Sequence, residues 1–265
     1  WHIQQGLDAY SAAEDGGGVC WTLALLGALA RERGEYTVAD QLLSQSLLLA
    51  HRANDTHAIG AQLNALSQVS WLRGDLTAAE DRGQRALESL SAVGDSEGIT
   101  WALINLGVTA RLRGDIVSAT VLLRHSLVLS EDHNYREGIA WSLNQLGVLA
   151  RLDGDAAAAL TQQTLSLAEH RRLGNRWRMA SVHDELAALA AADRDGQRAI
   201  THLGAADQHR REINVPLPSA EQPARDETVA AARALLGERF GAATLSGVAQ
   251  SGGCSSEHTL AVGAC

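Results

Sequence analysis

Residues 101–115 read WALINLGVTARLRGD, and residues 141–155 read WSLNQLGVLARLDGD. The two segments are 40 residues apart, and the same spacing separates Gly34, Gly74, Gly114 and Gly154. A fixed interval that recurs along a chain is the sequence signature of a repeat array. The sequence therefore predicts five stacked units, at residues 13–52, 53–92, 93–132, 133–172 and 173–212.

Each unit is predicted to be a helix, a tight turn and a second helix. In the third unit, Leu103 and Leu106 precede Gly114 and Leu123 follows it, as on the apolar faces of two successive helices. Gly114 suits the left-handed backbone just beyond the first helix. Asp115 is then placed to accept hydrogen bonds from the free amides that open the second helix.

Small side chains recur where the two helices of a unit are expected to touch. Gly107 and Ala119 are such positions, because a larger side chain at either would push the backbones apart. Leu106 is predicted to lie in the core. The residues predicted to be structural repeat positions are Gly27, Gly34, Ala39, Gly74, Ala79, Leu106, Gly107, Gly114, Ala119, Leu146, Gly147, Gly154 and Ala159.

This pattern resembles the tetratricopeptide signature. A Leu-Gly pair has an aromatic residue upstream and an alanine twelve residues after the glycine, as in Trp101, Leu106, Gly107 and Ala119. The resemblance covers residues 13–212 and implies an all-α fold, a right-handed superhelical solenoid of antiparallel helix pairs whose concave groove binds a protein or peptide. The unit is longer than the usual ~34 residues, and the usual proline near its end is absent. Helix-pair repeats of the HEAT class have the longer period but lack the Leu-Gly and alanine spacing.

The two ends of the chain depart from the repeat. Residues 1–12 align with the second helix of a unit, so the array is predicted to begin in the middle of a repeat. All three prolines fall in NVPLPSAEQP, residues 214–223, which predicts a break after the last unit. Residues 213–245 are predicted to form C-terminal capping helices, and residues 246–265 a disordered tail.

Residues 203–243, which begin LGAADQHRRE and end LLGERFGAA, carry a second resemblance. They are similar to the C-terminal end of large bacterial regulators of the LuxR/AfsR type, in which a nucleotide-binding switch domain is joined to a long-period tetratricopeptide array. The resemblance implies a sensor or docking domain of a cytoplasmic signalling or transcriptional regulator, with the upstream domains among its partners. After Ala243 the sequence departs from this pattern.

Composition disfavours several functions. The net charge of -9 disfavours direct binding of nucleic acid, and the absence of lysine excludes a P-loop lysine or a Schiff base. No apolar run is long enough to span a membrane, and three scattered cysteines fit a reducing cytoplasm. The ten histidines lack paired ligand spacing. We predict a chain that is not an enzyme and has no catalytic residue, no cofactor and no metal site.

We expect the first helix of each unit to line the groove. The side chains that face the groove should then be those at the positions equivalent, in each unit, to Trp21, Ala24, Ala28 and Arg31. Asparagine and arginine suit a peptide backbone or a carboxylate, and tryptophan offers a broad rigid contact. The alternative is that the tryptophans pack between units and the polar side chains are merely hydrated. The predicted partner-binding residues are Asn64, Gln68, Trp71, Trp101, Asn105, Arg111, Trp141, Asn144 and Arg151.

Two charged clusters are predicted to be solvated surface. They are the basic residues Arg171, Arg172, Arg176 and Arg178, and the acidic pair Asp184 and Glu185 beside His183. The alternative to a sensor domain is a stand-alone scaffold that self-associates through the apolar edge of the cut N-terminal repeat.

Overall fold

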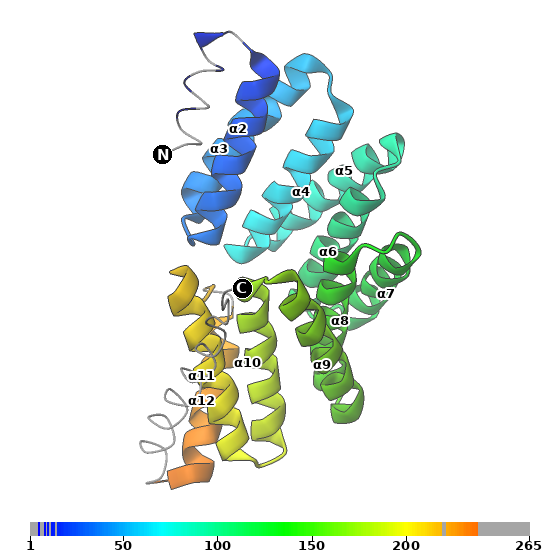
Figure 1. Ribbon diagram of the computed structural model, residues 1–265. Coiled ribbons are helices and arrows are strands. Elements are labelled where there is room, and N and C mark those ends of the chain that lie inside the picture. Colours follow the sequence, from blue (N-terminus) through cyan, green and yellow to red (C-terminus); the bar gives the residue numbers. More distant parts are fainter. Residues whose placement is uncertain are drawn as a thin grey trace, which may run out of the picture.

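The computed structural model describes residues 15–218 and 221–237, together with Gln5, Asp8, Tyr10, Ala12 and Ala13. These residues form helices and turns with no strand, which confirms the predicted all-α class. The helices follow one another as a curved stack (Figure 1). Their bounds are α2 Gly16–Glu32, α3 Tyr36–Ala53, α4 Thr56–Leu72, α5 Leu76–Val93, α6 Ser96–Leu112, α7 Ile116–Asp132, α8 Arg136–Leu152, α9 Ala156–Leu173, α10 Arg176–Ala192, α11 Gly196–Ile213 and α12 Gln222–Leu236.

The turns inside the second, third and fourth helix pairs have the predicted glycine and capping aspartate. Gly114 has a positive φ of 84°, which glycine adopts without steric cost. Asp115 accepts a hydrogen bond from the backbone N–H of Ser118 at 3.0 Å and so caps α7. Arg194 takes the glycine position of the fifth unit with a φ of 62°, a conformation that costs a non-glycine residue roughly 1–2 kcal/mol. The other glycines with this conformation at the same repeat position are Gly34, Gly74 and Gly154.

Small and bulky residues face each other across the first, third and fourth helix pairs. A Cβ on Gly107 would lie 2.7 Å from Leu123 Cγ, so glycine is what lets α6 and α7 approach this closely. The second unit is an exception, because both positions are small, with Ser67 at the glycine position and Gly83 at the leucine position. Leu106 of the next unit fills that space, because a Cβ on Gly83 would lie 2.9 Å from Leu106 Cδ2. The predicted core position of Leu106 is confirmed, since only 7% of it is exposed.

The first helix of each pair forms the inner face of the curve. Successive first helices contact one another along the array, α2 with α4, α4 with α6, α6 with α8 and α8 with α10. Among the described helices, no two successive second helices do so. Helices are closest on the inside of a curved stack, so α2, α4, α6, α8 and α10 line the groove.

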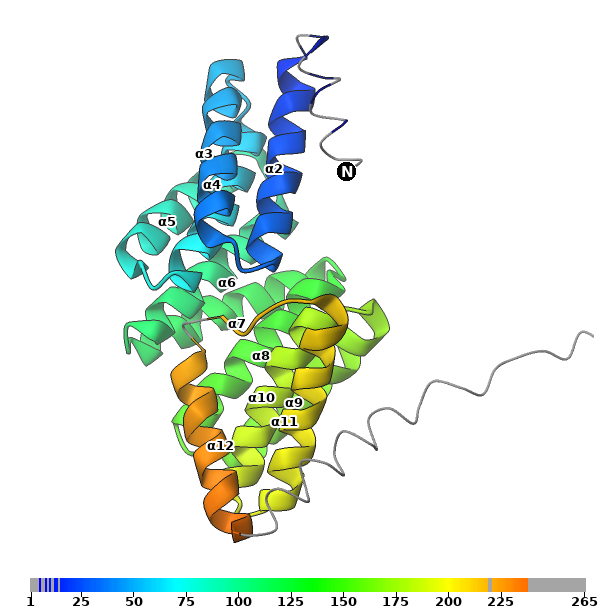
Figure 2. The same ribbon diagram turned by 90° about the vertical axis from the view of Figure 1, so that its left-hand side faces the viewer.

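The helix α12 folds back onto the array. It packs on α10 as well as on α11, and Val229 and Leu236 lie against a cluster that includes Ala187 and Leu203. Because α10 belongs to the inner face, α12 lies along the groove as well as against the last pair. Figure 2 shows the first part of the linker, directly after α11, crossing in front of the stack.

This linker also brings the first unit close to the last. A Cβ on Gly34, in the turn between α2 and α3, would lie 2.8 Å from Pro216 Cγ. The first unit therefore contacts the segment that follows the last one. The inner groove is bounded by this contact as well as by the stacked helices.

Three predictions concern residues outside those the structure describes. They are most of residues 1–12, residues 238–245 of the predicted cap, and the tail at residues 246–265. Within the described part of the chain, every helix is too short or too polar to cross a membrane.

Candidate binding groove

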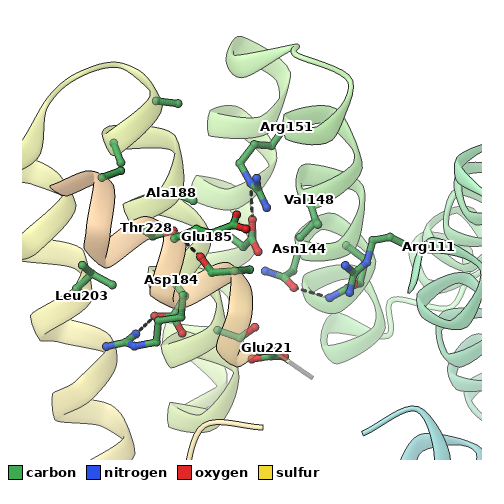
Figure 3. Close-up of a pocket in the computed structure, with 18 of the residues that line it drawn as sticks. Arg111, Asn144, Val148, Arg151, Asp184, Glu185, Ala188, Leu203, Glu221 and Thr228 are labelled. Atoms are coloured by element: carbon green, nitrogen blue, oxygen red, sulfur yellow. Dashed lines mark hydrogen bonds and ion pairs between the residues drawn. The ribbon is translucent and has the colours of Figure 1, made fainter. Parts of the chain in front are cut away.

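Two cavities lie along the inner face. The N-terminal cavity has a volume of about 290 Å³, and the C-terminal cavity, between the inner helices and α12, has a volume of about 350 Å³. The N-terminal cavity is lined by Arg31, Ala61, Asn64, Ala65, Gln68, Trp101, Asn105, Glu137 and Arg178. The C-terminal cavity is lined mainly by α6, α8, α10 and α12, and Figure 3 shows it at close range.

The structure brings the predicted groove residues to these two cavities. Asn64, Gln68, Trp101 and Asn105 line the N-terminal cavity. Trp71, Arg111, Asn144 and Arg151 line the C-terminal cavity. The ninth predicted residue, Trp141, lies beneath the N-terminal cavity, where its ring contacts Arg178.

Several of these side chains also join adjacent units. Trp71 Nε1 donates to Asn105 Oδ1 at 3.1 Å, and Asn105 Nδ2 donates to Asn64 Oδ1 at 2.6 Å. Trp101 Nε1 donates to the Tyr135 hydroxyl at 2.7 Å. These hydrogen bonds hold α4, α6 and α8 together, so the groove floor is fixed by contacts within the chain.

Arg178 is the main feature of the N-terminal cavity, and its predicted place on the surface is wrong. It is 5% exposed, and its guanidinium carbon lies 3.7 Å from the ring centre of Trp141 and 4.1 Å from that of Trp177. Its Nη1 has no hydrogen-bond partner among the described residues. Burial, and then the charge of Arg31, lowers the pKa of Arg178 to about 9.

The repeat alignment distinguishes Arg178 from the other arginines of the basic cluster. The equivalent residues one and two units earlier are Gly138 and Gly98. Adding a Cβ to Gly138 would bring it within 2.8 Å of Thr100 Cγ2, so this position faces the neighbouring unit. An arginine at a position that is otherwise small and enclosed is a better indication of a site than its membership of a basic cluster.

Asp184 belongs to a buried ion network, and its predicted place on a solvated face is also wrong. Its carboxylate accepts hydrogen bonds from Arg210 of α11 and Arg225 of α12, and Arg225 also bonds Asp207. The side chains of Asp184 and Arg225 are only 15% and 11% exposed. Asp184 stands 40 residues after Asn144. Asp184 therefore occupies a repeat position that is predicted to face the groove. Its ion pair with Arg225 of α12 could not be predicted from the repeat, because α12 lies outside the repeat units.

The remaining charges of the C-terminal cavity are partly paired. Arg151 Nε donates to Glu185 at 2.8 Å. Arg111 forms no ion pair with any described residue, and its Nε is buried without a partner. Burial, and then the charge of Asp184, raises the pKa of Glu221 to about 7. The cavity thus holds a cation and a carboxyl group that the described residues do not neutralise.

Comparison with known proteins identifies the fold. No protein-family model matches the sequence. No curated protein sequence matches it either. Among solved structures, the chain is similar to BtubC (BKLC) from P. vanneervenii, with a TM-score of 0.59 and 18% sequence identity over 82% of this chain and 92% of that one. At this identity the likeness concerns the fold alone, and the chain has a helical-repeat fold of the kind seen in BtubC.

Proposed function

We propose that this chain is a docking module of the tetratricopeptide type that binds a segment of a partner protein in its inner groove. The observation that carries the proposal is Arg178, a buried cation without an ion pair among the described residues, in a cavity lined by four predicted groove residues. A buried charge without a counter-charge is costly in free energy. An acidic side chain from a partner would supply that counter-charge.

The rest of the N-terminal cavity suits a peptide. Arg31 and Arg178 share the lining with one carboxylate, Glu137. Arg31 is also paired with Glu32 at 3.6 Å, so Arg178 is the lining arginine that has no ion pair with a described residue. Gln68 Oε1 accepts from Arg31, and Gln68 Nε2 donates to no described residue, so this amide nitrogen can donate to a peptide backbone. Trp101 adds a broad apolar surface of the kind that supplies much of the energy at protein interfaces.

We further propose the biological setting that the sequence resemblance implies. The chain would be the C-terminal part of a cytoplasmic bacterial signalling or transcriptional regulator, with a nucleotide-binding switch domain upstream. In that setting the groove senses or docks a partner, and this region neither catalyses a reaction nor binds nucleic acid. The net charge of -9 supports the last point.

Selection from a random peptide library displayed on phage tests the docking proposal. We expect the selected peptides to be rich in Asp and Glu. Arg178→Gln should weaken binding of a selected peptide by roughly tenfold or more, the usual effect of losing a charged hydrogen bond. Fluorescence anisotropy measures the binding. Circular dichroism should show unchanged helicity, because the substitution removes an uncompensated buried charge.

The control is Arg171→Gln, which removes an exposed arginine from the same basic cluster. It should leave peptide affinity unchanged. Equal affinities for the wild-type chain and Arg178→Gln would refute this role of the N-terminal cavity.

A second candidate function is a scaffold that self-associates. It is favoured by the outer face of α7, where Val117, Val121 and Val128 are 77%, 64% and 54% exposed. Exposed apolar side chains on one helix face are typical of an interaction surface. If this function holds, light scattering should show a dimer that Val117→Asp with Val121→Asp converts to a monomer. A monomeric wild-type chain at all concentrations would contradict it.

A further inference from the structure

The C-terminal cavity contains polar groups that nothing in the described chain satisfies. Arg111 Nε is a buried donor without a partner, and Gln145 Oε1 is a buried acceptor without a partner. Gln145 is 4% exposed, and its Nε2 donates to Asn144 Oδ1 at 2.7 Å. This hydrogen bond fixes the amide with Oε1 as the free end. Buried polar atoms without partners are rare and call for an explanation.

A carboxyl group completes the set from another wall of the cavity. Glu221 stands at the start of α12, is partly buried, and forms no ion pair or side-chain hydrogen bond with a described residue. Figure 3 shows Glu221 entering the cavity from α12, and Arg111 entering from the opposite side. Arg111 and Glu221 interact electrostatically, yet they do not form an ion pair. The space between them separates two opposite charges.

The other partly buried charged side chains of this cavity already form ion pairs. Arg151 is paired with Glu185, and Asp184 with Arg225. Glu227 also lines the cavity but is exposed to solvent. Among the charged and amide side chains that line the cavity and are not exposed, the groups left without described partners are one cation with a free donor, one carboxyl group and one free acceptor.

We propose that the C-terminal cavity binds a small zwitterion, an α-amino acid with an apolar side chain. Its carboxylate would accept hydrogen bonds from Arg111, and its ammonium group would donate to Glu221 and Gln145. Its side chain would lie against Val148 and Ala188, which also line the cavity. The volume of about 350 Å³ is near the lower end of the roughly 300–1,000 Å³ of ligand sites, which suits a small ligand.

The site connects α12 with the inner helices. Arg111 belongs to α6 and Gln145 to α8, whereas Glu221 belongs to the start of α12. A bound amino acid therefore holds α12 in place along the groove. This inference goes beyond the docking function and uses a different cavity, so either can fail without the other.

Calorimetry on the wild-type chain with L-leucine as the first probe, followed by the other common amino acids, tests the proposal. L-leucine or another apolar amino acid should bind and raise the melting temperature. N-acetyl-leucine lacks the ammonium group, and leucinamide lacks the carboxylate. Each should bind roughly ten- to hundredfold more weakly, as expected for the loss of a charged hydrogen bond. In the dipeptide Leu-Gly the ammonium and carboxylate groups are further apart. It should bind more weakly than leucine if the cavity takes a free amino acid, and binding as tight as that of leucine would point to a peptide terminus and overturn the proposal.

Two variants test which residue binds each charged end of the ligand. Arg111→Gln should weaken binding of leucine but not of leucinamide, and Glu221→Gln should weaken binding of leucine but not of N-acetyl-leucine. Arg124→Gln and Glu88→Gln remove exposed charges elsewhere and should have no effect. Failure of every amino acid to bind, or equal binding of leucine and its two analogues, would overturn the proposal. These analogue comparisons need no variant, and phage selection tests the docking function separately.

Discussion

Replacing Asp184 with alanine is expected to release α12 from the array. Asp184 is the acceptor shared by Arg210 and Arg225, so its removal leaves two largely buried guanidinium groups without this counter-charge. Breaking a buried ion pair by removing one partner costs about 3–5 kcal/mol. Only Thr228 and Ala232 of α12 are buried, and Val229 and Leu236 are partly buried against the array, so we expect this packing not to offset such a loss.

Hydrogen exchange measured by mass spectrometry checks this result. Amides of α12 should exchange much faster in Asp184→Ala than in the wild-type chain, while those of α4 to α9 stay protected. Asp193→Ala is the matched control, because Asp193 lies at the end of the same helix but is exposed. Unchanged protection of α12 would show that apolar packing alone holds it.

Acidification is expected to destabilise the fold through His170. This histidine is fully buried, and neither ring nitrogen has a hydrogen-bond partner among the described residues. Its ring lies edge-on to Trp141 of the same unit. Burial, and then the charge of Arg178, lowers the pKa of His170 from 6.5 to about 3. Between these values the unfolded chain binds a proton that the folded chain does not, so stability falls as the pH falls from 6.5 toward 3.

The expected size of this effect is about 1.4 kcal/mol for each pH unit below 6.5, or roughly 3 kcal/mol by pH 4. His183, whose pKa burial also lowers to about 3, acts in the same direction. Glu221 acts in the opposite direction: its pKa is raised to about 7, so its contribution is present below its ordinary value of 4.5 and is lost as the pH rises through 7.

Urea unfolding of His170→Leu at several pH values isolates the contribution of His170. The variant should lose less stability than the wild-type chain between pH 6.5 and 4, and it should be no less stable at pH 7, because two unsatisfied polar atoms are removed. His51→Leu, at an exposed histidine, should keep the wild-type pH dependence. Parallel pH profiles for the wild-type chain and His170→Leu would contradict the prediction.

The local features of this protein follow from its sequence. Gly114 and Asp115 form the turn and the cap, Leu106 lies in the core, and the groove register reaches both cavities. These features depend on contacts within a unit or between neighbouring units. A side chain that recurs every 40 residues meets the same surroundings each time. The period therefore predicts which residues form the turns, the caps, the core and the groove.

The tertiary structure decided the features that depend on distant segments. The environment of Arg178 comes from tryptophans of three units, and that of Asp184 from α11 and α12. The place of α12 along the groove, and the contact of Pro216 with Gly34, depend on how strongly the whole stack curves. Curvature is the sum of small rotations between units. No local pattern in the sequence encodes that sum, so the closure of the groove emerges only in the folded chain.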